Sequence, residues 1–188
     1  MSEELIVRHC SPTLAGLKTA NMFNCPYSSA RELMDSIRSV NSALGPKGVR
    51  MLPLRIREGA ALIYVYRPAR LQRDLCDPVS AAILSERGYP GAAAPGLLAE
   101  LRSRLCKNDG FPHEIGLFLG YPPDDVNCFI SDRGRACKCV GCWRAYNDPV
   151  GAEKTFALYK KCTRLYCRAH KAGRTLSKLT VSERVQAG

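Results

Sequence analysis

The chain has 188 residues, about the size of one domain, and 46% of them are hydrophobic, which excludes a disordered chain. Its longest apolar run, residues 60–66, is too short to cross a bilayer, and residues 1–5 lack the basic start of a secretory signal. The sequence therefore predicts a folded, cytoplasmic protein with no membrane association. The 28 Lys and Arg residues outnumber the 17 Asp and Glu residues, and the net charge of +11 favours acidic partners.

The N-terminal part is predicted to begin with a short strand at residues 4–9. The next stretch, residues 14–23, suits either a strand or a helix. Residues 28–44 are predicted to form a helix, because Ser28 or Ser29 can cap its start and Gly45-Pro46 ends it. Its apolar residues fall on one face: Leu33, Ile37, Val40 and Leu44.

Residues 49–56 and 60–66 are predicted to form a β-hairpin, because two β-rich runs flank a short loop that contains Gly59. In the second run, large apolar side chains point to both faces of the strand, so both faces are predicted to be covered by other parts of the protein. The hairpin is expected at the centre of a small sheet, with the 28–44 helix packed on it.

The second half of the chain is predicted to be mainly helical. A strand at 139–146 is expected to return to the sheet, and a long last helix is expected at 149–173. Four helices are expected before them, at 79–87, 97–106, 112–119 and 123–130. Together these elements predict one α+β domain over residues 1–188, with a small antiparallel or mixed sheet around the hairpin and several packed helices. The loop at 89–96 is the one place where a seam could divide a sheet-containing part from a mainly helical part.

The last helix carries most of the excess positive charge. Residues 150–188 contain nine Lys and Arg residues against two Glu residues, a net charge of +7. At 100° per residue, the basic residues of the helix share a stripe roughly 120° wide, with Phe156 and Tyr166 opposite. Residues 174–188 are expected to form a short helix or turn with a frayed tail. We expect five residues of the stripe to bind an acidic partner, the alternative being a merely solvated face: Lys160, Lys161, Arg164, Arg168 and Lys171.

Several stretches resemble a known family. They are residues 9–16 (HCSPTLAG), 64–68 (YVYRP), 111–122 (FPHEIGLFLGYP) and 160–163 (KKCT). Over nearly its whole length the chain resembles the bacterial domain-of-unknown-function family 3793 of anaerobic Firmicutes. The resemblance implies no particular activity. Because genes of that family can lie near a flavodoxin gene, it favours redox or iron-related metabolism, with an acidic redox protein such as a flavodoxin as partner.

One departure from the family pattern lies among the cysteines. The family has an aromatic residue before the tryptophan, whereas here Cys142 precedes Trp143, and Cys139 is also extra. The resemblance therefore leaves Cys137 as the family-like thiol. The spacing C-x-C-x2-C could offer two or three thiolates to zinc or a soft metal, but it lacks a second half, so no closed four-ligand zinc site is expected.

The ten cysteines are interpreted as reduced thiols, most of them in the core, because no export signal accompanies them. Cys10 follows His9 at the end of the predicted strand, where exposed backbone N–H groups could lower its pKa and favour the thiolate. Neighbours on a strand point to opposite faces, so contact between these two side chains is not assumed. His113, at the start of a predicted helix, is a further candidate acid, base or ligand.

The leading hypothesis is an accessory protein of redox or metal metabolism, where the metal would be iron or iron in haem. The sequence contains no nucleotide-binding motif and identifies no particular cofactor, although its Cys and His residues could bind a metal or haem. One alternative is a nucleic-acid-binding module that uses the basic last helix, and another is an enzyme with a thiol nucleophile at Cys10. The candidate catalytic residues are Cys10 and His113. The candidate cofactor-binding residues are His9, Cys10, His113, Cys137 and Cys162.

Overall fold

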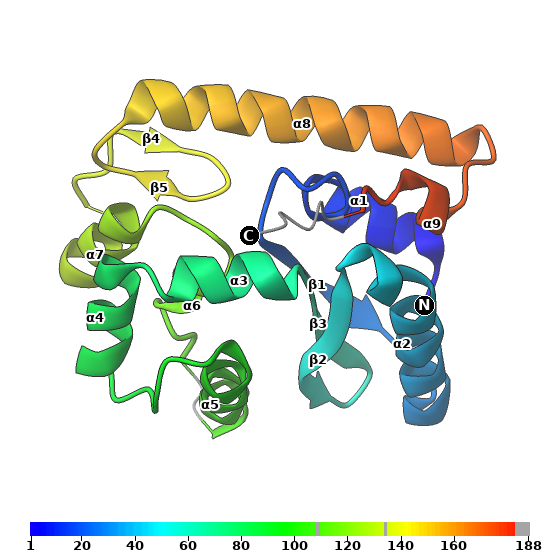
Figure 1. Ribbon diagram of the computed structural model, residues 1–188, viewed down its shortest axis with the longest axis horizontal. Helices are drawn as coiled ribbons and strands as arrows, with labels where there is room; N and C mark the ends of the chain where they lie inside the picture. Colours follow the sequence, from blue (N-terminus) through cyan, green and yellow to red (C-terminus); the bar gives the residue numbers. More distant parts are fainter. Residues whose placement is uncertain (108–109, 134, 183–188) are drawn as a thin grey trace, which may run out of the picture. The chain divides into compact units, whose positions relative to one another are not determined.

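The computed structural model describes residues 1–107, 110–133 and 135–182, and its fold is α+β, as predicted (Figure 1). The chain divides into two compact units. The first unit joins Met1–Ala69 to Lys161–Gly188, and the second is Arg70–Lys160. The loop at 89–96, where a seam was predicted, lies within the second unit. The end of the predicted frayed tail lies outside the described residues.

The first unit is built on a three-stranded antiparallel sheet with the order β1-β3-β2. The strands are β1 (Ala20–Pro26), β2 (Arg50–Arg57) and β3 (Ala60–Tyr66). The predicted hairpin is confirmed: β2 pairs with β3 and the turn between them uses Gly59, whose φ of +73° suits a residue without a Cβ. Both faces of β3 are buried, as the run of apolar residues from Ala61 to Val65 predicts.

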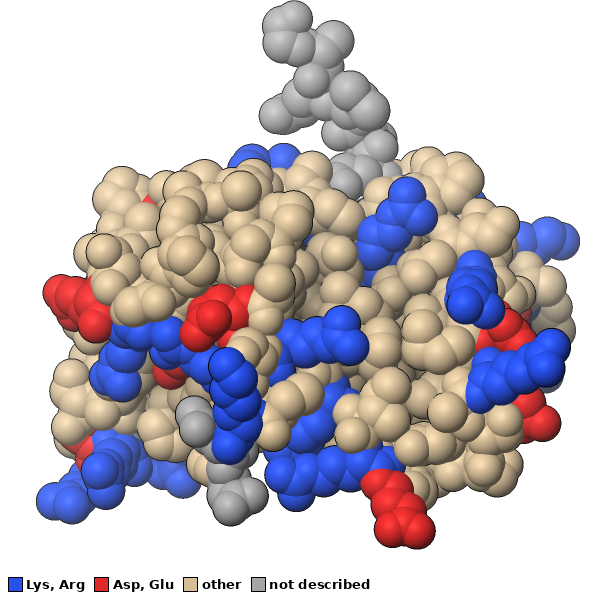
Figure 2. Space-filling model, turned by 90° about the horizontal axis from the view of Figure 1, so that it is seen from below, with Lys and Arg blue, Asp and Glu red and all other residues tan. Residues whose placement is uncertain are grey.

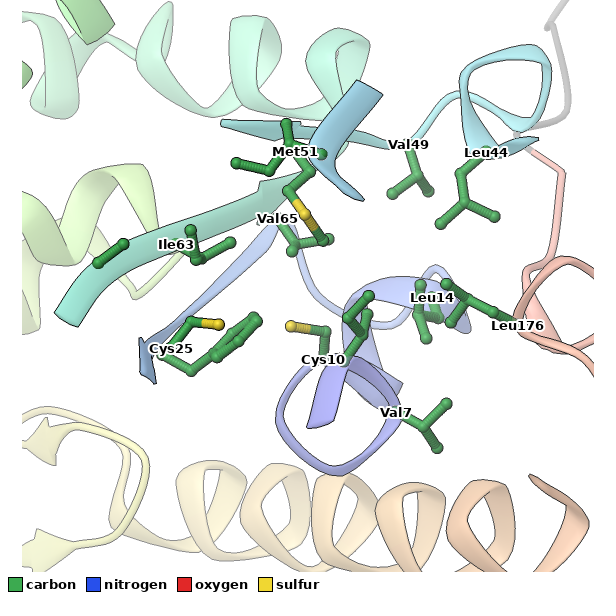
Figure 3. Packing of buried hydrophobic residues seen from close by; sticks show 14 of the residues in the cluster. Val7, Cys10, Leu14, Cys25, Leu44, Val49, Met51, Ile63, Val65 and Leu176 are labelled. Atoms are coloured by element: carbon green, nitrogen blue, oxygen red, sulfur yellow. The ribbon is translucent and has the colours of Figure 1, made fainter. Parts of the chain in front are cut away.

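Helix α2 (Ala30–Leu44) packs on the hairpin, as predicted. Its start is fixed by Ser29, whose hydroxyl oxygen accepts a hydrogen bond from the backbone N–H of Glu32. Its buried residues, including Leu33 and Ile37, join Met51 of β2 and apolar residues of β3 in one hydrophobic cluster. Figure 3 shows part of this cluster, with Met51, Ile63 and Val65 labelled. Burial of this face holds the helix against the sheet.

The predicted strand at residues 4–9 is wrong, because these residues belong to helix α1 (Glu3–Leu14). The Ser2 hydroxyl caps this helix by accepting a hydrogen bond from the backbone N–H of Leu5, and the helix continues through Pro12. Strand β1 starts only at Ala20. The buried apolar residues of α1 recur at helical spacing: Ile6, Val7, Cys10 and Leu14.

The described C-terminal end is tied to the C-terminal end of α1. The guanidinium of Arg67, which is only 2% exposed, donates hydrogen bonds to the carbonyls of Thr13, Leu14 and Val181 at 2.8, 2.8 and 2.7 Å. The Val181 backbone N–H in turn donates to Leu14 O. The short helix α9 (Leu176–Leu179) lies just before Val181 in the chain. A buried cation therefore joins the last carbonyls of α1 to the Val181 carbonyl near the described C-terminal end.

The helices of the second part of the chain largely follow the prediction. Helix α4 begins at Pro78, and the Asp77 carboxylate caps it by accepting from the backbone N–H groups of Val79 and Ser80. One helix, α3 (Pro68–Leu75), was not predicted. The others are α4 (Pro78–Glu86), α5 (Ala94–Lys107), α6 (Ile115–Phe118) and α7 (Pro123–Asp132).

The prediction that residues 139–146 return to the main sheet is wrong. They form a separate antiparallel pair, β4 (Cys139–Val140) and β5 (Arg144–Ala145). The turn between them contains Gly141, whose backbone lies so close to the Phe156 ring that a Cβ would collide with it. This close approach seats the turn on a small apolar cluster of its own rather than on the three-stranded sheet.

Helix α8 (Pro149–Lys171) is the predicted long last helix. The Asp148 carboxylate accepts a hydrogen bond from the backbone N–H of Gly151 at 2.9 Å and so caps its start. In the second unit, Ala152 and Phe156 are buried with Ala145. Among the described helices, α8 included, none has both the length and the hydropathy that crossing a bilayer requires.

Candidate functional site

Cys10 lies in the hydrophobic core of the first unit. Figure 3 shows its side chain among the apolar side chains of this cluster, and none of its surface is exposed. Burial raises the pKa of the Cys10 thiol far above its usual range, and the opposing effect of Lys18 is smaller. The structure does not supply the exposed strand end that motivated a reactive Cys10, because this residue is helical and packed.

His9 lies on an exposed part of α1 and stacks on the Phe23 ring, with 5.3 Å between the ring centroids. Its pKa is lowered, first by partial burial and second by the positive charge of Arg8. Adjacent helical residues point about 100° apart, so the exposed imidazole and the buried Cys10 thiol face different surroundings.

The remaining predicted thiols occupy separate environments. Cys162 of α8 is 6% exposed, and burial raises its pKa from 9.0 to about 11. Cys137 lies 3.8 Å from a guanidinium nitrogen of Arg144, and Cys139 lies 3.8 Å from a carboxylate oxygen of Glu153. Within the described parts of the chain, no group of three or more His, Cys, Asp and Glu side chains is placed to hold a metal ion.

His113 is exposed and meets the Phe129 ring edge-on, with 5.1 Å between the ring centroids. Its neighbour Glu114 is buried and accepts hydrogen bonds from the Tyr89 hydroxyl at 3.0 Å and from Arg104 at 3.4 Å. The Arg104 guanidinium also lies 4.0 Å from the centroid of the Tyr89 ring. Glu114 thus belongs to a buried polar network that sequence reasoning missed, whereas His113 packs at the surface.

The five basic residues predicted to share one face of α8 are all exposed. We call them the basic face: Lys160, Lys161, Arg164, Arg168 and Lys171. An aliphatic side chain, Leu165, lies among them and is 46% exposed. On another side of the helix, Tyr166 and Cys167 pack against the core of the first unit and fix the rotation of this segment. Figure 2 shows a different side of the molecule, over which Lys and Arg side chains are also spread.

The second unit contains a cavity of about 510 Å³. Two aromatic side chains, Trp143 and Tyr159, form part of its wall. Its remaining lining comes mostly from the starts of α7 and α8, and the carboxylates among them are Asp124, Asp125 and Asp148. None of the lining residues among those described is Lys or Arg.

The Trp143 ring in this wall is held in place by hydrogen bonding and by packing. Its indole N–H donates to Asp125 Oδ2 at 2.9 Å, and the ring packs edge-on against Phe156 with 4.5 Å between centroids. The other oxygen of Asp125 accepts from the backbone N–H groups of Tyr146 and Asn147 at 2.9 and 3.2 Å. One buried carboxylate therefore orders the segment that carries the aromatic wall.

Sequence reasoning missed Asp125 because an Asp in the first turn of a helix is explained by the helix dipole alone. The one signal available was Trp143, the only tryptophan in the chain, whose indole N–H requires an acceptor when the ring is packed inside a protein.

The fold and these sites define a basic α+β protein with a positively charged helix face and a separate acidic cavity with aromatic walls. The chain belongs to the family described as protein of unknown function (DUF3793), whose model matches residues 6–180, which confirms the predicted resemblance. No curated protein and no solved structure matches the chain.

Proposed function

We propose that this protein is an accessory protein of redox or iron-related metabolism that binds an acidic protein such as a flavodoxin through the basic face of α8. The observation that carries the proposal is the exposure of all five basic side chains, on a helix whose rotation is fixed by Tyr166 and Cys167. The partner class follows from charge complementarity, and the metabolic setting follows from the family resemblance.

The charges of the basic face lie close enough together to act on one partner. From Lys160 to Lys171 the helix rises about 17 Å at about 1.5 Å per residue. Adjacent members of the set are separated by about one turn or less, which is shorter than the Debye length of about 8 Å at physiological ionic strength. No Asp or Glu interrupts residues 160–171. An approaching acidic surface would therefore meet a local field that salt screens only in part.

The neighbourhood of the basic face favours a protein partner over a nucleic acid. Leu165 exposes 46% of its surface among the charges, and aliphatic contact beside charged residues is typical of protein interfaces. Single-stranded nucleic acids are bound on exposed aromatic side chains, but Tyr166 packs against the core and Phe156 is buried. Nucleic-acid binding is therefore kept as an outcome of the test.

The state of the cysteines supports action in the cytoplasm. All ten are free thiols, which suits a reducing compartment. The burial of Cys10 and Cys162 favours binding over thiol chemistry as the function, because a nucleophile needs both access and a thiolate.

A charge-reversal experiment tests the proposal. The test variant changes three residues of the basic face to Glu: Lys161, Arg164 and Arg168. The control variant changes three exposed basic residues of other helices to Glu, so that the net charge falls equally: Arg31, Arg73 and Arg102. The dissociation constants of both variants and of the unmodified protein are measured at low salt with a purified flavodoxin as the acidic probe.

We expect the test variant to bind at least about tenfold more weakly than the control variant, because three attractive contacts become repulsive. Equal binding by the two variants would reduce the effect to total charge and contradict the proposal. A parallel titration with single-stranded RNA separates the two classes of partner. Tighter binding of RNA than of flavodoxin, lost only in the test variant, would favour the nucleic-acid alternative.

A further inference from the structure

The cavity of the second unit has the size and the lining of a site for a small molecule. Its volume of about 510 Å³ falls within the range of about 300–1,000 Å³ that is typical of ligand pockets. Its lining combines aromatic rings, carboxylates and small residues such as Gly151 and Ala152. All of these residues belong to one unit, so the cavity does not depend on the basic face of α8.

The charge of the lining is opposite to that of the protein. Three carboxylates line the cavity, those of Asp124, Asp125 and Asp148, and no Lys or Arg is among the described lining residues, although the net charge of the chain is +11. Asp125 is committed to four N–H donors of Trp143, Tyr146 and Asn147. Asp124 and Asp148 are exposed. One oxygen of Asp148 accepts from the Gly151 N–H at the start of α8, and the two carboxylates together supply the negative charge that an incoming ligand would meet.

The aromatic wall adds a second attraction for positive charge. The faces of Trp and Tyr rings attract cations, most strongly in the case of Trp. Trp143 is positioned before any ligand arrives, because its N–H is bonded to Asp125 and its ring packs against Phe156 and Tyr121. A rigid aromatic wall loses little conformational entropy on binding.

The arrangement suits a molecular cation rather than a bare metal ion. A metal ion needs several ligand atoms that converge on one point, and the described residues contain no group of three or more His, Cys, Asp or Glu side chains placed in this way. The carboxylates are instead distributed around a wide, partly aromatic space. We propose that this cavity binds a small organic cation with an alkylammonium group, held by the Trp143 and Tyr159 rings and by the carboxylates of Asp124 and Asp148.

The single tryptophan makes this inference directly testable. Because Trp143 is the only tryptophan in the chain and lines the cavity, intrinsic fluorescence reports on its occupancy. The full-length protein is titrated with choline and, separately, with 3,3-dimethyl-1-butanol, which has nearly the same shape without the charge. We expect choline to change the emission saturably and to bind at least about tenfold more tightly than the neutral alcohol.

Matched variants assign the effect to the cavity. The combined Asp124→Asn and Asp148→Asn changes keep side-chain size and allow Asn to cap α8, and they should weaken choline binding at least about tenfold without changing the response to the alcohol. The control combines Asp35→Asn with Glu58→Gln, exposed carboxylates of the first unit, and should bind like the unmodified protein. Equal affinity for the charged and neutral probes, equal loss in both variants, or no saturable response to choline would overturn the proposal.

Discussion

Replacing Asp125 by Asn tests whether one buried carboxylate orders the second unit around Trp143. Asp125 is 5% exposed, and each of its oxygens accepts from N–H donors: Oδ2 from the Trp143 indole, Oδ1 from the backbone of Tyr146 and Asn147. Asn has nearly the same shape but only one acceptor oxygen. Whichever way its amide turns, its NH2 group must face a buried N–H donor at a position where the carboxylate now accepts.

The expected loss follows from these contacts. A hydrogen bond to a charged group contributes about 1.5–3 kcal/mol, and a buried donor left without an acceptor costs about 1–3 kcal/mol. Since the bonds share one carboxylate and are not additive, we expect Asp125→Asn to lower the free energy of unfolding by about 2–4 kcal/mol. Urea unfolding followed by circular dichroism measures this change, and a red-shifted Trp143 emission in the folded variant would show that the indole has lost its fixed environment.

The neighbouring residue provides the control. Asp124 is exposed in the first turn of α7, so Asp124→Asn should cost only about 0.3–1 kcal/mol through the helix dipole. If the free energies of unfolding of Asp125→Asn and Asp124→Asn differ by less than about 0.5 kcal/mol, the four hydrogen bonds do not stabilise the unit and the reasoning is refuted.

Three further predictions concern the first unit. Arg67→Ala should lower the free energy of unfolding by about 3–5 kcal/mol in urea titrations, because three short hydrogen bonds to backbone carbonyls are lost, and a change below about 1 kcal/mol would contradict this. Iodoacetamide should alkylate the exposed Cys142 of the native protein at least about 100-fold faster than Cys10, because the Cys10 thiol becomes accessible only when the protein unfolds. Mass spectrometry measures the two rates, and similar rates would show that Cys10 is accessible. The free energy of unfolding should fall between pH 9 and pH 11, because the pKa of the Cys162 thiol is 9.0 in the unfolded chain and about 11 in the folded protein. Cys162→Ala should make that fall shallower in urea titrations at different pH values, and an unchanged slope would exclude the thiol as a cause.

The elements that could be predicted are those whose signals lie within the element itself. The hairpin of β2 and β3 follows from two β-rich runs around Gly59, and α2 follows from its Ser29 cap and its single apolar face. The basic face of α8 follows from spacing alone, because a long helix displays every residue at a known angle. The packing of Tyr166 and Cys167 against the core then determines which side of α8 is exposed.

The errors arose where two local signals compete. Residues 4–9 contain β-favouring residues, and Pro12 suggested a break, yet the Ser2 cap and the spacing of the buried residues favour a helix. For the turn at Gly141, the deciding contact is with Phe156, fifteen residues further along the chain. No local pattern reports such a contact.

The candidate site was predicted only in part for the same reason. Charge and exposure on one helix are readable from the sequence, whereas the cavity brings together Asp125 and Trp143, which are 18 positions apart. The burial of Cys10 was also hidden, because its reading as a strand-end thiol depended on the wrong secondary structure.

Zero-length cross-linking tests the docking proposal most directly. A carbodiimide joins a lysine amine to a carboxylate only when the two are in contact, so mass spectrometry of the cross-linked complex with flavodoxin locates the interface. The proposal predicts cross-links at three lysines of the basic face: Lys160, Lys161 and Lys171. Lys107 and Lys138, which are exposed elsewhere in the chain, should remain unlinked. Cross-links at those two lysines and none on α8 would contradict the proposal.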